Sequence, residues 1–175
     1  MELTKQEILS KLLEVYSHQY NIDADGSENG MGHYPATATY FLRDENYLIT
    51  KKHVLNAVEN YDYMYFLLAD HLDAETLRKE IDFSFEEGMK RIKPHKEHMS
   101  SFVSLVIIAD SIDDDAKKLL KRIKRRKYFR LALHGWMEYH IAAIETCTQS
   151  VLSNPAGRDK RKTLEQNFVP KKRSL

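Results

Sequence analysis

Two similar segments, 40 positions apart, constrain the fold more than any other feature of the sequence. Residues 66–75 (FLLADHLDAE) and 106–115 (VIIADSIDDD) each contain an apolar strand, an Ala-Asp pair, a variable residue, an aliphatic residue and an Asp before a predicted helix. Asp73 and Asp113 are placed to cap these helices, because an Asp side chain accepts hydrogen bonds from the free N–H groups of a helix start. The pattern indicates either a duplicated strand-helix unit or two buried strands with convergent turn chemistry.

The remaining sequence predicts further strands and helices around these two units. Helices are predicted over 5–20, after a capping box from Thr4 to Glu7, and over 51–60, 77–92, 114–126, 136–154 and 158–168. Strands are predicted over a hairpin of 36–42 and 47–50, with a turn at 44–46, and over 61–69, 101–109 and 128–133. Strands that alternate with helices favour a parallel sheet, and the hairpin adds an antiparallel part.

The predicted fold is therefore α/β, a single-domain mixed sheet with an N-terminal helix, a hairpin and successive strand-helix units. Residues 1–154 are expected to form this domain, and residues 155–175 a basic C-terminal tail. A chain of 175 residues, 42% of them hydrophobic, is long enough to bury a core without a stabilising metal or disulfide. No cofactor is expected to be required for folding.

Cysteine content and hydropathy bear on the compartment. Cys147 is the single cysteine, so an intramolecular disulfide cannot form, which favours a reducing compartment. The longest apolar block, 105–109, is far shorter than the roughly 20 residues of a membrane-spanning helix, and residues 1–10 contain no signal-peptide core. We therefore expect a soluble, cytoplasmic protein that does not enter a membrane.

Charge is balanced in total but not in position. Residues 117–130 include nine basic residues and no acidic one, and residues 154–175 include seven basic and two acidic residues. The net charge of the chain is only +1, so the remaining residues carry −13. The candidate ligands of a nucleic acid or another anion are Lys121, Arg122, Lys124, Arg125, Arg126 and Lys127. In the alternative, these charges complement a helix dipole or attract the acidic remainder of the chain.

Polar residues follow three successive predicted strands. Asp70 with His71, Asp110 and His134 stand at these strand ends, and the carboxyl ends of parallel strands meet at one edge of a sheet. Two carboxylates and two imidazoles at one edge predict a catalytic site with a divalent metal or acid-base chemistry. The alternative is turn chemistry, because Asp residues before helices satisfy free backbone N–H groups.

A second candidate metal site lies at His95 and His98. The two imidazoles have Glu97 between them, and both residue types are zinc ligands. The segment follows Pro94, however, and its spacing does not place the side chains on a common face. The alternative is a pair of surface histidines that hydrogen-bond within the protein.

Six of the ten tyrosines fall between residues 34 and 65. Aromatic rings on a sheet face stack nucleic-acid bases when cationic side chains are interleaved with them. The charges of this window are balanced, so packing in the core and at its rim is the preferred interpretation.

The order helix, hairpin, strand, helix, strand over the first 110 residues resembles the core of restriction-endonuclease-like folds. Those nucleases use a carboxylate-x-lysine motif on the third strand. The corresponding run, 61–69, contains Asp62 and Met64 but no lysine. Because this lysine is missing, the metal-dependent cleavage that the resemblance implies is not expected of this chain, and no family is assigned.

Three functions remain open. The first is a non-enzymatic binding or regulatory domain that recognises a protein partner or a second copy of the chain, because charge segregation and aromatic residues outweigh any catalytic set. The second is a nucleic-acid-binding protein that uses the basic helix and the basic tail. The third is a metal-dependent hydrolase with its site at the carboxyl ends of the strands.

Overall fold

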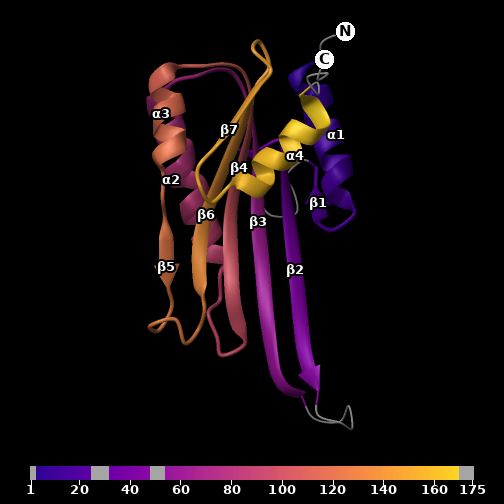
Figure 1. Cartoon of the computed structure of the whole chain (residues 1–175), viewed down its shortest axis with the longest axis vertical. Coiled ribbons are helices and arrows are strands. Elements are labelled where there is room, and N and C mark those ends of the chain that lie inside the picture. The colour runs from indigo at the N-terminus through magenta and orange to yellow at the C-terminus, as the bar shows by residue number, and fades with distance from the viewer. Residues whose placement is uncertain (1–2, 25–31, 48–53, 170–175) are drawn as a thin grey trace, which may run out of the picture.

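The computed structural model describes residues 3–24, 32–47 and 54–169, which form a mixed seven-stranded sheet with two helices on each face (Figure 1). The helices are α1 (Lys5–Ser17), α2 (Ala74–Arg91), α3 (Asp114–Arg122) and α4 (Arg158–Phe168). The strands are β1 (Asn21–Asp23), β2 (Ala36–Tyr47), β3 (Val54–Leu72), β4 (His98–Ile112), β5 (Arg126–Tyr128), β6 (Trp136–Glu145) and β7 (Ser150–Ser153). The predicted α/β class, with an N-terminal helix and strand-helix units, is confirmed.

The strands follow the order β1-β2-β3-β4-β6-β5, and β7 also pairs with β6. β3, β4 and β6 are parallel to one another, whereas all other pairs are antiparallel. The two similar segments of the sequence lie side by side in register, with Phe66 opposite Val106 and Leu72 opposite Ile112. Each of these strands continues directly into a helix, as the pattern predicted.

Two of the three expected helix caps form. Thr4 Oγ1 accepts from the Glu7 N–H at 3.2 Å, and Glu7 Oε2 accepts from the Thr4 N–H at 2.7 Å, which completes the capping box of α1. Asp73 Oδ1 accepts from the Thr76 N–H at 2.7 Å at the start of α2. Asp113 occupies the cap position of α3, but its side chain makes no cap hydrogen bond.

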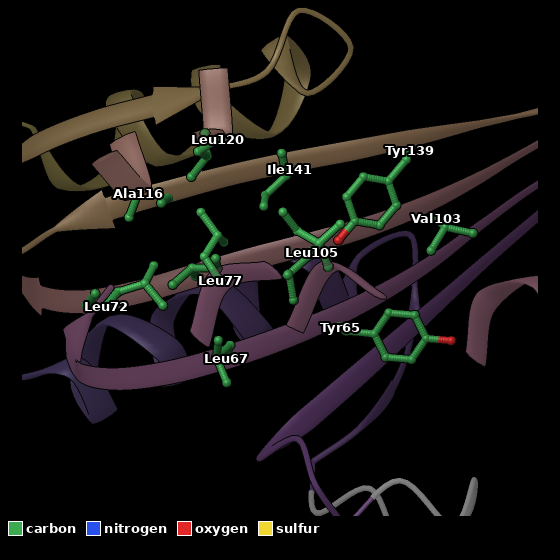
Figure 2. Close-up of a cluster of buried hydrophobic side chains, with 14 of the residues drawn as sticks. Tyr65, Leu67, Leu72, Leu77, Val103, Leu105, Ala116, Leu120, Tyr139 and Ile141 are labelled. Carbon is green, nitrogen blue, oxygen red and sulfur yellow. The ribbon is translucent and has the colours of Figure 1, made fainter. Parts of the chain in front are cut away.

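Side chains that alternate along the parallel strands build a core on each side of the sheet. Figure 2 shows the core under α2 and α3, which includes Tyr65, Leu67, Leu77, Leu105, Leu120, Tyr139 and Ile141. The core under α1 and α4 includes Leu12, Met64, Phe66, Val106, Ile108, Ala142 and Leu164. Because both faces of β3, β4 and β6 are covered here, these strands are apolar almost without interruption.

The hairpin differs from the predicted one. β2 runs without a break to Tyr47 and pairs with β3, so the expected turn at 44–46 lies within a strand. Residues 54–60, expected to be helical, are the first part of β3, while 48–53 lie outside the described residues. Figure 1 shows this hairpin extending past the helices. Charged residues are tolerated along it because no described helix covers it there, and Arg43 Nη1 pairs with Glu59 Oε1 at 2.5 Å across the two strands.

The predictions for 128–133 and 136–154 are also wrong. The strand β5 ends at Tyr128, and residues 129–135 form turns in which Arg130, Leu131 and Ala132 have positive φ. The strand β6 replaces most of the predicted helix. Apolar residues point to both faces of β6, and such a run has no clear period of two, so its sequence does not distinguish a strand from a helix.

The C-terminal helix forms at the predicted residues, 158–168. α4 packs on β6 and β7, and its Leu164 is fully buried in the core that it shares with α1. The basic segment after Asn154 is therefore anchored to the sheet through α4. Within the described residues, no helix has the length and apolar character needed to cross a membrane.

Candidate anion-binding groove

The carboxyl ends of β3 and β4 meet as predicted, but a lysine lies between their carboxylates. Lys5, at the start of α1, forms ion pairs with Asp70 and with Asp110, the latter at 2.5 Å between Nζ and Oδ2. Thr146 Oγ1 donates to the other oxygen of Asp110 at 2.9 Å. The hydrogen bond from Lys5, aided by that from Thr146, lowers the pKa of Asp110. Both carboxylates thus share one cation of the chain, Lys5, as their partner.

Three of the four predicted catalytic residues lie at this edge, and the fourth does not. His71 is held there by Ser111, whose Oγ lies 2.8 Å from Nδ1, and by Asp113, whose Oδ1 lies 3.3 Å from Nε2. His134 lies at the opposite end of the sheet, because β6 begins after it and ends at Glu145. Among the described residues, no group of three or more His, Cys, Asp and Glu is arranged to hold a metal ion.

The candidate metal ligands His95 and His98 are neighbours, with 6.3 Å between ring centroids. His98 is buried, and its ring lies 2.6 Å from the His134 carbonyl oxygen through Nδ1 and 2.8 Å from Ser101 Oγ through Nε2. Burial lowers the pKa of His98 and favours the neutral ring. His95 Nε2 lies 2.9 Å from Glu59 Oε2. Each imidazole therefore has partners within the protein.

The two basic segments of the sequence meet around the short edge strand β7. A groove of about 560 Å³ runs there, lined by both α3 and the start of α4, although the two helices pack on opposite faces of the sheet. Figure 1 shows β7 between them. The lining residues with cationic or hydroxyl side chains are Lys117, Lys121, Ser150, Ser153, Arg158 and Arg161.

A second hollow of about 340 Å³ lies next to the first along the edge of β6. Asn154 and Pro155 line both hollows, so the two lie side by side and are together called the groove. Lys124, Arg125 and Arg126 add three cations, which brings the total along the groove to seven. The single carboxylate among the lining residues, Glu138, pairs with Arg126 at 2.6 Å.

A family model described as a domain of unknown function, DUF8052, matches residues 4–166. The chain belongs to the DUF8052 family. No curated protein and no solved structure shows significant similarity to it. All seven cations of the groove lie within the matched residues, so the groove is part of the DUF8052 domain rather than of an appended tail.

The charges of the DUF8052 groove are only partly neutralised by the chain itself. Four of its cations form ion pairs, namely Lys117 with Glu145, Arg125 with Asp82, Arg126 with Glu138 and Arg161 with Glu165. Lys121, Lys124 and Arg158 have no carboxylate within 4.0 Å in the part of the chain that the structure describes. The groove therefore carries an excess of positive charge.

Four of the six predicted anion ligands line the DUF8052 groove, namely Lys121, Lys124, Arg125 and Arg126. Arg122 faces a different hollow, between α2 and α3, and Lys127 lies over the ring of Phe129 with Nζ 5.9 Å from its centroid. Arg158 and Arg161 had been noted only as members of a basic tail. Their position opposite α3 depends on the packing of α4, which no local pattern encodes.

Asn154 holds the floor of the groove at the outer edge of β6, between the residues that pair with β5 and those that pair with β7. It is 1% exposed. Its Oδ1 accepts from the N–H groups of Ile141 at 3.1 Å and Gly157 at 2.8 Å, and its Nδ2 donates to the carbonyl oxygens of Ile123 at 3.1 Å and Tyr139 at 2.9 Å. One side-chain amide thus joins α3, β6 and the start of α4.

Asn154→Ala is expected to lower the free energy of unfolding by about 2 kcal/mol, because it leaves buried backbone groups without hydrogen-bond partners. Urea denaturation followed by circular dichroism measures this change. Asn167→Ala is the matched control, since the Asn167 side chain is exposed and makes one hydrogen bond to the Thr163 carbonyl oxygen within α4. Equal stability of the two variants would contradict the role of Asn154.

Proposed function

We propose that the protein is a non-enzymatic binding domain that holds the phosphate backbone of a nucleic acid in its cationic groove. The observation that carries the proposal is the convergence of Lys121 and Arg158 on one groove from opposite faces of the sheet. A dipole effect within α3 explains the basic residues at its own C-terminus but not the cations that α4 places opposite them. Nucleic acid is therefore favoured over the other binding partners considered.

The chemistry of the groove fits a chain of phosphates. Backbone phosphates are regularly spaced anions, and each one neutralised by Lys or Arg releases a condensed counterion. Ser153 supplies a hydroxyl donor between the cations of α3 and those of α4, whereas Ser150 Oγ donates to Glu145 Oε2 at 3.2 Å. Lys121, Lys124 and Arg158 contribute most, because a ligand does not have to compete with a carboxylate of the protein for them.

The proposal is tested by fluorescence anisotropy with a labelled oligonucleotide. We expect binding at about 50 mM salt and a linear fall of log Kobs with log salt concentration. The double variant Lys121→Glu/Arg158→Glu is expected to bind about 30-fold more weakly at low salt and to reduce the magnitude of the salt slope by about 1.5. Both substituted side chains lie at the surface of the groove, so folding is expected to be retained.

The control is the double variant Lys93→Glu/Lys96→Glu, which makes the same change in net charge far from β7. Both lysines are exposed after α2 and have no ion pair among the described residues. The control is expected to bind within about twofold of the wild type. Absence of wild-type binding at low salt, or an equal loss in the two double variants, would overturn the groove as the binding site.

A further inference from the structure

Beyond the groove, the face of the sheet that carries α1 and α4 is covered over only part of its length. Figure 1 shows both helices over the upper part of the strands, and no described helix lies over the lower part of this face. Phe102, Tyr128 and Trp136 lie there on three neighbouring strands, β4, β5 and β6. Tyr128 is 55% exposed, and the other two rings are half-buried. We call these three residues the aromatic platform.

The rings of the aromatic platform are neighbours on one face. Tyr128 is the register partner of Trp136, and the ring centroids of Trp136 and Phe102 are 5.7 Å apart. His140 stacks on Phe102 from the covered side, with 4.4 Å between centroids and an interplanar angle of 27°. The platform is therefore supported by packed side chains and is fixed in orientation by strand pairing.

Arg126 connects the aromatic platform to the groove. It lines the second hollow beside Lys124 and Arg125, and its guanidinium carbon lies 5.0 Å from the Trp136 ring centroid and 5.9 Å from that of Tyr128. A nucleic-acid strand that leaves the groove at Arg126 would therefore lie directly beside the rings of the platform. In the tyrosine-rich window of 34–65 the charges are balanced, and Arg43 is paired with both Glu59 and Glu97, whereas Arg126 lies over two rings of the platform beside further cations of the groove.

We infer that the domain binds single-stranded nucleic acid, with the backbone in the groove and successive bases stacked on Trp136, Tyr128 and Phe102. The inference rests on the proposed function, to which it adds the class of nucleic acid. Bases reach a flat sheet face only when they are unpaired, because in a duplex their faces are covered by neighbouring base pairs. Every base has a π-face, so stacking of this kind tolerates many sequences.

The chain contains one tryptophan, and it is part of the platform, so the wild-type protein reports on stacking directly. We expect an oligothymidylate of about 16 nucleotides to quench the Trp136 fluorescence to a saturating level. A matched abasic oligonucleotide keeps the phosphates and lacks the bases. It is expected to bind about tenfold or more weakly and to leave the fluorescence unchanged.

Tyr128→Ala separates the rings from the phosphates. This variant is expected to lose about fivefold or more in affinity for oligothymidylate and to bind the abasic oligonucleotide as the wild type does. Phe41→Ala is the control, since Phe41 is 51% exposed and its ring centroid lies 4.9 Å from that of Tyr61 on the other face of the sheet. It is expected to change neither affinity.

The outcomes distinguish the two proposals. Equal, salt-dependent binding of oligothymidylate and the abasic oligonucleotide, without quenching, would overturn the aromatic platform and leave the groove as the binding site. Tighter binding of a duplex than of a single strand would likewise overturn the aromatic platform and leave the groove as the binding site. Absence of binding by every oligonucleotide would overturn both the platform and the proposed function.

Discussion

Lys160→Met is expected to lower the free energy of unfolding by about 3–5 kcal/mol, because it leaves a buried carboxylate without its charge partner. Lys160, on α4, is 4% exposed, and its Nζ donates to Asp62 Oδ2 at 2.6 Å and to Asp159 Oδ2 at 2.7 Å. Asp62 is 2% exposed and also accepts from Ser104 at 2.7 Å and Tyr20 at 2.8 Å. Burial, the largest single influence, lowers the pKa of Lys160, but the interactions with Asp62, Tyr20 and Asp159 together outweigh it and raise that pKa. The lysine thus remains charged in the folded protein. Urea denaturation at about pH 7 measures the loss.

Two further variants make this prediction specific to the buried pair. Lys162→Met, two positions along α4, removes an exposed lysine without an ion pair among the described residues, and we expect a change within about 0.5 kcal/mol. Asp62→Asn in the Lys160→Met background is expected to recover part of the loss, because Asn keeps an acceptor for Ser104 and Tyr20 but carries no charge. If Lys160→Met were as stable as Lys162→Met, the pair would not hold α4 on the sheet.

This pair also bears on the resemblance to restriction-endonuclease-like folds. The third strand of the sequence has Asp62 but no lysine two positions later, where Met64 stands. In the folded chain a lysine does lie beside Asp62, but it comes from α4, 98 positions along the sequence. The side chains of Lys160, on α4, and Asp62, on β3, are both buried. Their observed role is to join this helix to the face of β3.

The parts of the fold that were predicted correctly are those with local signals. The apolar runs before Asp73 and Asp113 mark where buried strands become helices, and the capping box at Thr4 marks the start of α1. The residues that form each of these signals are close together in the sequence, so the signals can be recognised without knowing the fold. The mixed sheet follows from them, because parallel strands joined by helices leave few topologies.

The parts that were not predicted depend on contacts distant in sequence. On β6, Tyr139 faces α2, where its hydroxyl lies 2.7 Å from Ser84 Oγ, and its neighbour His140 faces the other side. A strand buried on both faces loses the alternation that identifies it. The long β2–β3 hairpin was missed for the opposite reason, since polar residues such as Asp44 suggest a turn although they lie on a part of β2, 41–44, that is exposed on both faces.

The candidate sites divide in the same way. The basic run of α3 was visible in the sequence, but its partner cations on α4 required β7, which no pattern indicated. His134 was placed at the wrong end of the sheet because 128–133 was predicted to be a strand that ends before it, whereas His134 precedes the parallel strand β6. The position of Lys5 between Asp70 and Asp110 has no local signal, since the residues are 65 and 105 positions apart.

Glu145→Gln is expected to lower the free energy of unfolding by about 3 kcal/mol at about pH 7. Glu145, at the carboxyl end of β6, is 4% exposed. Burial acts to raise its pKa, but hydrogen bonds from Thr148 Oγ1 at 2.5 Å, Lys117 Nζ at 2.9 Å and the Ile112 N–H at 2.8 Å outweigh burial and hold the pKa at about 2. Gln cannot supply the charge that these donors stabilise.

The pH dependence follows from the direction of this shift. The pKa of Glu145 falls from 4.5 in the unfolded chain to about 2 in the folded protein, so its contribution is fully present above about pH 4.5 and disappears as the pH falls towards 2. The stability of Glu145→Gln is therefore expected to approach that of the wild type over this interval, as measured by urea denaturation at a series of pH values. Glu86→Gln, at an exposed position of α2, should keep the wild-type profile. Parallel wild-type and Glu145→Gln profiles between pH 4.5 and about 2 would show that the buried carboxylate is not the group responsible.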